Sequence, residues 1–312
     1  MKQFAKRIAL PHCLLAILIA VVIRVPNERM TTRAYGSFLA AICMMELLFL
    51  LTVFRRKQHK KSRDMWNING SCGIMCIVWM LLLAWELVTS VWNVAHPVLI
   101  PAPENVFDTF REHWHLLLLN VVYSMQLLII GFVLGMALAL ILGLFAGCVP
   151  KVKAWAYPIA NVMAPIPPIV VSPYLVALMP TFRSASVVVI LLGVFWPSFL
   201  NTVNRVSGIE REIMDSARML QPDTATMVFK ILLPYILPSV VSGLKTSLST
   251  AFLMLNFAEL MGATHGMGYY IQNSITYANY SHAVAGIIMI GIVVTFLNYL
   301  VTQVQKHLIK WH

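Results

Sequence analysis

Long apolar runs alternate with short polar connections along this chain. Runs of membrane-crossing length lie at residues 8–24, 36–54, 72–95, 116–148, 155–180, 185–204, 236–261 and 283–305. A hydrocarbon core of ~30 Å needs ~20 apolar residues in a helix, so each run is a candidate span. The first run is short and Pro11 interrupts it. The pattern therefore predicts an all-α integral membrane protein with eight helices.

Composition and charge agree with the hydropathy pattern. The 312 residues are 59% hydrophobic and 11% charged, which is more apolar surface than a soluble domain of this size can bury. The net charge of +11 does not point to nucleic acid, because most Lys and Arg residues, including the cluster at 55–63, fall on one side of the predicted spans. By the positive-inside rule, both termini and the connection at 205–235 are expected in the cytoplasm.

The basic start of the chain, followed by an apolar run, resembles a signal peptide. No small-x-small cleavage site follows Ile23, so an uncleaved signal anchor is expected. Cys72 and Cys76 lie one helical turn apart, but no second pair or matching histidine accompanies them. We expect reduced structural thiols, and no metal site.

Two segments are expected along the chain. Residues 1–64 are predicted to form an accessory N-terminal transmembrane hairpin that ends in the basic cluster. Residues 65–312 predict a core of six spans that carries every recognisable motif. One helix of this core has two small-xxx-small pairs, Gly131 with Gly135 and Gly143 with Gly147, which allow close approach of a neighbouring helix in lipid.

Prolines and acidic residues inside the spans have two interpretations each. Prolines break a helix, and broken backbone in a bilayer must be buried in protein or line a wet cavity. The run at 155–180 is therefore either a kinked packing helix or the lining of a translocation path; its prolines are Pro165, Pro167, Pro168 and Pro173. A buried acid costs ~2.5–3.5 kcal/mol at a helix centre, so Glu46, Glu86 and Glu259 are expected to pair across helices or contact substrate.

The long polar connection before the seventh run has an amphipathic pattern. Ile213, Ala217 and Leu220 recur at i, i+4 and i+7, which predicts one short helix. Pro222 breaks it and suits the first position of a second helix. Such a pair lying under the membrane is either a lever that a soluble partner can push or an ordinary connector resting on the lipid surface.

The same connection resembles the signature loop of permease subunits of bacterial ATP-binding-cassette importers. That loop reads Glu-Ala-Ala, three residues, Gly, nine residues, Ile-x-Leu-Pro. This chain keeps the spacing with Asp215, Ser216, Ala217, Leu220, Gln221, Ile231, Leu233 and Pro234. Gln221 replaces the glycine, and Pro222 favours an extended conformation there, so we expect a differently shaped turn.

Other segments resemble the nitrate/sulfonate/taurine-type branch of these permeases. They are Trp85-Glu86, the stretch 99–104, Pro165-Ile166-Pro167-Pro168, Asn201-Thr202 and Ala258-Glu259-Leu260. The resemblance implies the type I importer transmembrane fold, here a six-helix core with an added hairpin. Glu86, Asn201, Glu259 and the prolines Pro165, Pro167 and Pro168 are candidates for lining the pathway or for pairing between helices.

The resemblance further implies a bacterial inner membrane and several partners. These are a second permease copy, two cytoplasmic ATPase subunits that hold ATP and Mg²⁺, and an external substrate-binding protein. The chain has no phosphate-binding Gly-x-x-x-x-Gly-Lys motif, so no catalytic residue and no cofactor is expected in it. The branch carries small solutes, among them sulfonates, nitrate and vitamin precursors. A degenerate permease acting as receptor or scaffold, and a secondary transporter, are the alternatives.

Overall fold

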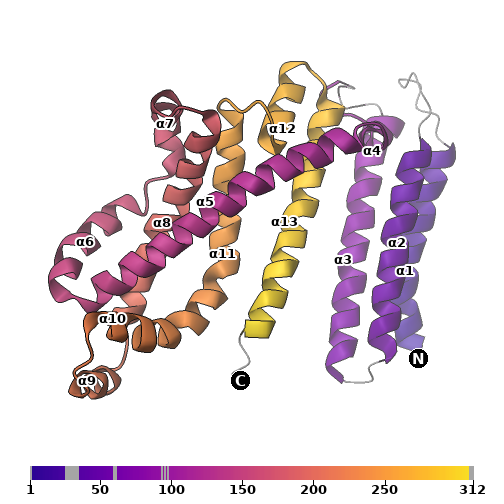
Figure 1. The fold of residues 1–312 in the computed structure, drawn as a ribbon. Helices are drawn as coiled ribbons and strands as arrows, with labels where there is room; N and C mark the ends of the chain where they lie inside the picture. The colour runs from indigo at the N-terminus through magenta and orange to yellow at the C-terminus, as the bar shows by residue number, and fades with distance from the viewer. Residues whose placement is uncertain are drawn as a thin grey trace. The chain divides into compact units, whose positions relative to one another are not determined.

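The computed structural model is helical through almost all of the chain that it describes, residues 2–24, 35–58, 62–92, 94, 96 and 98–308 (Figure 1). Its internal contacts divide the chain into two compact units. One unit comprises Met1–Leu116 with Asn273–Ile287, and the other comprises Leu117–Gln272 with Ile288–His312. The all-α fold class predicted from the apolar runs is confirmed.

In the described part of the chain, six helices are long and apolar enough to cross a membrane, fewer than the eight runs predict. They are Tyr35–Val53, Gly70–Val91, Trp114–Cys148, Phe182–Ser207, Thr224–Leu260 and Tyr280–His307. The first run forms a shorter apolar helix, Leu10–Arg24. The run at 155–180 is not one helix, because Pro150–Met163 and Pro168–Leu178 meet at 82° where the prolines cannot continue the helix.

The first unit contains the N-terminal helices of the chain. Its elements are α1 (Lys2–Arg24), α2 (Tyr35–Gln58), α3 (Ser62–Glu86), the π-turn η1 (Leu87–Val91) and α4 (Pro103–Glu112). α1 packs against α3, and α2 packs against α3 and α4. Leu18, Phe38, Ile42, Phe49 and Trp79 form the buried centre of this packing. The predicted hairpin thus shares a core with α3, and the boundary at residue 64 stays a prediction.

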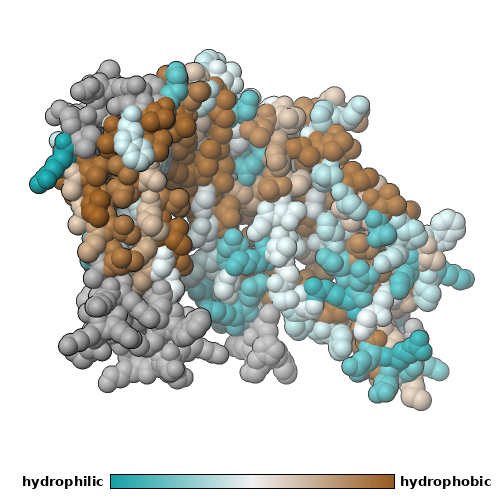
Figure 2. All heavy atoms as spheres, turned by 180° about the vertical axis from the view of Figure 1, so that it is seen from behind, coloured by the Kyte–Doolittle hydropathy of each residue, from teal (hydrophilic) through white to brown (hydrophobic). Residues whose placement is uncertain are grey.

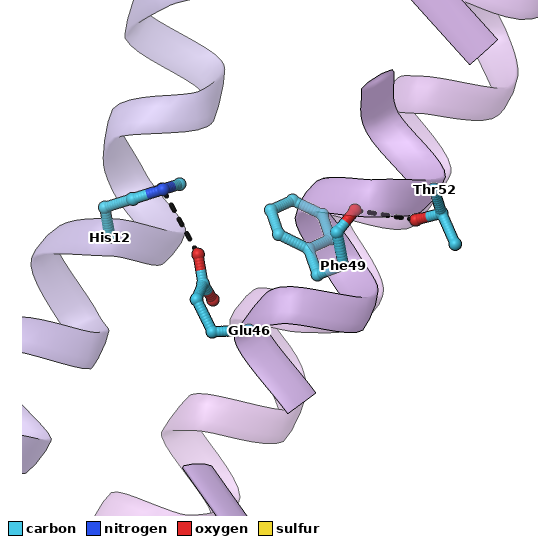
Figure 3. A network of polar contacts seen from close by, with 4 residues as sticks. All are labelled: His12, Glu46, Phe49 and Thr52. Atoms are coloured by element: carbon cyan, nitrogen blue, oxygen red, sulfur yellow. Dashed lines mark hydrogen bonds and ion pairs between the residues drawn. The ribbon is translucent and has the colours of Figure 1, made fainter. Parts of the chain in front are cut away.

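A polar contact crosses the apolar hairpin. His12 of α1 lies with Nε2 at 3.1 Å from Oε1 of Glu46 on α2 (Figure 3). Thr52 of α2 donates its hydroxyl to the Phe49 carbonyl at 2.7 Å, so that group is satisfied within its own helix. Glu46 therefore has a partner on the neighbouring helix, as the cost of a buried acid led us to expect.

The second unit contains the remaining elements, some of which begin or end in the first unit. They are α5 (Trp114–Cys148), α6 (Pro150–Met163), η2 (Pro168–Val171), α7 (Ser172–Leu178), α8 (Phe182–Ser207), α9 (Arg211–Met219), α10 (Thr224–Thr226), η3 (Met227–Leu232), α11 (Leu233–Leu260), α12 (Met267–Thr276) and α13 (Tyr280–Leu308). α8 is central, since it packs against α11, α6 and α7. Hydrophilic residues gather toward the end of the unit that carries α9, at the lower right of Figure 2.

The four glycines of α5 lie where this helix meets α8. A Cβ on Gly131 would lie 2.7 Å from Cβ of Ile190, and one on Gly135 would lie 2.9 Å from the Leu191 carbonyl oxygen. In the second pair, a Cβ on Gly143 would lie 2.8 Å from Cβ of Thr202, and one on Gly147 would lie 2.7 Å from Cβ of Val206. The missing side chains let the two backbones approach closely, which confirms the prediction from the small-xxx-small pairs.

Gly135→Leu should separate α5 from α8, because the atom nearest its Cβ position is backbone and cannot rotate away. We expect a loss of ~1–3 kcal/mol in the free energy of unfolding, typical of overpacking, seen as a lower melting temperature of the detergent-solubilised protein. Ala137→Leu, at an exposed position of the same helix, is the matched control and should change little. Equal melting temperatures for the two variants would contradict the close α5–α8 packing.

Candidate functional site

The helix α9 is held to its unit by one buried side. Ala217 lies in a buried cluster with Leu144 of α5, Val206 of α8, and Val228 and Leu232 of η3. Half-buried Met214 packs on the same cluster, whereas Ile213 and Leu220 are exposed. The predicted apolar stripe was therefore correct only at Ala217. Leu220 lies outside it because α9 ends at Met219.

The far side of α9 faces solvent and mixes polar and apolar groups. Asp215 and Ser216 are exposed, and the Ser216 hydroxyl donates to the Glu212 carbonyl at 2.7 Å. Met219 and Leu220 are 86% and 79% exposed, among the most exposed large apolar side chains of the described chain. Two such side chains side by side at the tip of a polar loop are typical of a surface that contacts another protein.

The turn after α9 is left-handed at Gln221. Its φ is 46°, one of two positive values at non-glycine residues in the described chain. The extended conformation predicted from the following Pro222 is therefore wrong. Glutamine in this region costs ~1–2 kcal/mol, which the packing on both sides of the turn must offset. The positive φ angle at Gln221 is one that a glycine would adopt without steric cost.

Asp223 caps the start of the next helix and was not predicted from the sequence. Its carboxylate accepts a hydrogen bond from the Thr226 amide at 3.2 Å, which is an N-cap. Pro222 therefore lies before the cap and not at the first helical position. The hydrogen bonds from Thr226 lower the pKa of Asp223, so the cap is present at neutral pH and is lost only when pH falls below that lowered pKa. An Asp directly before the first helical residue was the available signal.

The second helix of the loop does not stand alone. α10, η3 and α11 run on as one apolar stretch from Thr224 to Leu260. Pro234 lies in the first turn of α11, directly after the π-turn η3. Ile231 and Leu233 are half-buried against the Ala217 cluster. Phe229 adds an edge contact to Phe145 of α5, with ring centres 6.0 Å apart.

At the opposite end of α11, Glu259 is enclosed by hydrogen bonds. Ser124 of α5 donates its hydroxyl to Oε1 at 2.6 Å, and the Gly268 amide donates to Oε2 at 2.8 Å. The Met267 amide donates to Ser124 Oγ at 2.8 Å. These amides belong to the first turn of α12, whose N–H groups lack helical partners and favour a carboxylate. Glu259 therefore pairs within the protein.

Glycines make this Glu259 cluster possible. The Gly266 amide donates to Oδ1 of Asn120 at 2.8 Å, with φ at 120°, a conformation that strains other residues. A Cβ on Gly268 would lie 2.6 Å from the Asn256 carbonyl oxygen. α5, α11 and the start of α12 are thus joined by buried polar contacts that admit no side chain at either glycine.

Glu86 lies in the first unit and contacts a second acid. Glu86 is 1% exposed, and its carboxyl lies beside the carboxyl of Glu104 and near Ser90. Trp85 donates its indole N–H to the Pro101 carbonyl at 3.0 Å. The structure therefore joins the Trp-Glu pair to the 99–104 stretch, a contact with Glu104 that spacing did not suggest.

Asn201 and the prolines lie in different surroundings. Asn201 lines a cavity of about 250 Å³ between α5, α8 and α11, whose lining includes none of Pro165, Pro167 and Pro168. Pro168 is buried, and its ring lies 3.6 Å from the Cβ position of Gly193 on α8. Pro165 and Pro167 are exposed at the bend. Buried Pro168 therefore packs against α8, whereas Asn201 faces an open space.

Comparison with known proteins identifies the relatives of this chain. Residues 135–311, more than half of its length, match the family described as "Binding-protein-dependent transport system inner membrane component". The putative aliphatic sulfonates transport permease protein of Bacillus subtilis is 28% identical over 237 residues, which are 74% of this chain and 84% of that protein.

Two further relatives are named for other solutes. The taurine transport system permease protein of Escherichia coli is 23% identical over 80% of this chain and 91% of that protein. The nitrate import permease protein of Leptolyngbya laminosa is 24% identical over 78% of this chain and 89% of that protein. All three relatives are transport permeases, which confirms the resemblance drawn from the signature loop. The chain belongs to the family of inner-membrane components of binding-protein-dependent transport systems.

Proposed function

We propose that this protein is the membrane-spanning permease subunit of an ATP-driven importer, coupled to a separate ATPase through α9 and the segment up to η3. The observation that carries the proposal is the two-sidedness of α9. One side buries Ala217 in a cluster with α5, α8 and η3, and the other exposes Met219 and Leu220. A helix that is fixed on one side and ends in an exposed apolar tip can receive a push from a partner and pass it on as a rigid body.

The push would travel along α11. This helix begins in the Ala217 cluster and ends at Glu259, whose carboxylate is held by α5 and α12. Both ends are thus tied to neighbouring helices by buried contacts. A displacement of α9 would therefore move α11 together with α5 and α8, which is the rigid motion that alternating access requires.

The partners follow from the family and from charge. A binding-protein-dependent system uses an external protein to deliver solute, and we assign two ATPase subunits, carrying ATP and Mg²⁺, and a second copy of this chain to the complex. Basic residues near α9, among them Lys151, Lys153, Arg211 and Lys230, support a cytoplasmic position for this end. Both chain termini would then be cytoplasmic, in a bacterial inner membrane.

The solute is proposed to be a small anion. The three relatives are named for aliphatic sulfonates, taurine and nitrate, which share a compact group of negatively charged or polar oxygens. The secondary-transporter alternative leaves the exposed apolar tip of α9 without a role. The degenerate-permease alternative drew support from the replacement of the loop's glycine by Gln221. That support is lost, because Gln221 keeps the left-handed conformation.

Exchanging the tip of α9 tests the coupling surface. We expect Met219→Asp with Leu220→Asp to abolish co-purification of a P-loop ATPase from native membranes while the permease still inserts. The physical reason is loss of the apolar contact area. Tyr277→Asp, at a similarly exposed residue in the turn after α12, is the matched control and should retain the ATPase. ATPase recovery that is unchanged in the double variant would refute α9 as the docking helix.

Two substitutions at residue 221 test the shape of the turn. Gln221→Gly should keep ATP-driven uptake and change the free energy of unfolding by no more than ~1 kcal/mol, because glycine accepts a positive φ. Gln221→Val should lose most uptake, because a β-branched residue resists that conformation. Uptake in reconstituted vesicles and thermal unfolding provide the readouts. Similar behaviour of both variants would argue against the left-handed turn.

Two glycines near the start of α12 test the Glu259 cluster. Gly268→Ala should lower the free energy of unfolding by ~1–3 kcal/mol and reduce uptake, since its Cβ would collide with the Asn256 carbonyl and Glu259. Gly262→Ala is the matched control, because its nearest neighbours are Phe182 ring carbons at 3.7 Å, an ordinary contact. If both variants melt at the wild-type temperature, the cluster does not hold this end of α11.

A further inference from the structure

The cavity beside Asn201 contains an unpaired cation. Arg205 lies one turn after Asn201 on α8 and lines the same space. Its Nη1 atom is buried and has no hydrogen-bond partner among the described residues. Nη2 faces α11, 3.7 Å from the Cβ position of Gly243, where the missing side chain leaves room. The Arg205 side chain therefore lines the cavity, and no acid is among the residues that line it.

The rest of the lining suits an anion. No Asp or Glu is among the residues that line the cavity, whereas Asn201, Thr246 and Ser247 add an amide and two hydroxyls. These groups can donate hydrogen bonds, and the guanidinium can only donate. A buried charge without a partner is costly, so a site of this kind is normally completed by a counter-charge.

The size of the cavity limits what can bind. Its volume is about 250 Å³, and a water molecule occupies ~30 Å³ of liquid, so a solute or headgroup of a few heavy atoms fits. Arginine presents parallel N–H donors that match two oxygens of a sulfonate or phosphate group. A halide or a large organic ligand would use this geometry less well.

We propose that Arg205, with Asn201 and the α11 hydroxyls, forms a binding site for a sulfonate- or phosphate-type oxyanion at the α9 end of α8. The oxyanion is either the solute in transit, which rests on the proposed function, or the headgroup phosphate of an anionic lipid. Both sources offer the same chemistry to the guanidinium. The site adjoins the Ala217 cluster along α8, since Val206, a member of that cluster, follows Arg205 directly.

The test measures thermal unfolding of the full chain in nanodiscs of phosphatidylcholine, titrated with ethanesulfonate. Wild-type protein should be stabilised by ethanesulfonate, and Arg205→Gln should weaken its apparent affinity by on the order of tenfold or more. Gly243→Val should have a similar effect by filling the cavity while keeping the charge. Lys245→Gln is the control. It removes an exposed cation of α11 that does not line the cavity, and it should leave the affinity for ethanesulfonate unchanged.

A second arm separates the two sources. The titration is repeated in nanodiscs that contain phosphatidylglycerol, and native mass spectrometry counts the anionic lipid retained by each variant. Stabilisation by ethanesulfonate in both lipids identifies a solute site. Stabilisation in phosphatidylcholine alone, with phosphatidylglycerol retained by wild type and lost from Arg205→Gln, identifies a lipid site.

Other outcomes overturn the proposal. Wild-type protein that ethanesulfonate does not stabilise and that retains no anionic lipid has no such site. The proposal is equally overturned if Arg205→Gln is stabilised by ethanesulfonate and retains anionic lipid to the same extent as wild type. Because the assay uses the permease without an ATPase, its result is independent of recruitment through α9. If the chain recruits an ATPase but its anion binding does not depend on Arg205, the site is absent. If anion binding depends on Arg205 but no ATPase is recruited, the chain is not the proposed importer subunit.

Discussion

The packing of α9 on the helix ends around it is the contact on which the proposed mechanism depends. Ala217 presents only a methyl group to Val228 and Leu232, and so the short helix lies close to the buried cluster. A helix of this length is not stable alone in water, because nucleation costs more than a few hydrogen bonds return. Its position must therefore come from tertiary packing. The same packing makes α9 move with the spans instead of independently.

Polar groups inside this apolar protein are treated in two ways. Glu259 is fully satisfied by Ser124 and by amides of α12, so it fixes one end of α11. Arg205 is buried at Nη1 and has no partner in the described chain, so its charge is available to a ligand. Satisfied groups specify a rigid structure, whereas an unsatisfied group in a cavity implies something absent from the protein itself. The distinction separates structural from functional polar residues on α8 and α11.

The sequence could predict features that local pattern controls. Apolar run length predicts most of the spans, and the glycine spacing of α5 predicts its close contact with α8, because each depends on one helix. The partner of Glu86 could not be predicted, since Glu104 lies in a different helix and is joined to it only by the fold. The Gln221 turn was predicted wrongly, because tertiary packing overrode the local preference before Pro222. The Asp223 cap was visible in the sequence and was missed.

The central claim is that α9 and its neighbouring spans move as one body. Spin labels at Glu212 and Asn204, exposed on α9 and α8, measure the distance within one chain, and labels at Glu212 alone measure it between two copies in the assembled complex. Trapping the ATPase with nucleotide should change the distance between copies and leave the distance within the chain unchanged. A change within the chain, with none between copies, would contradict the rigid lever.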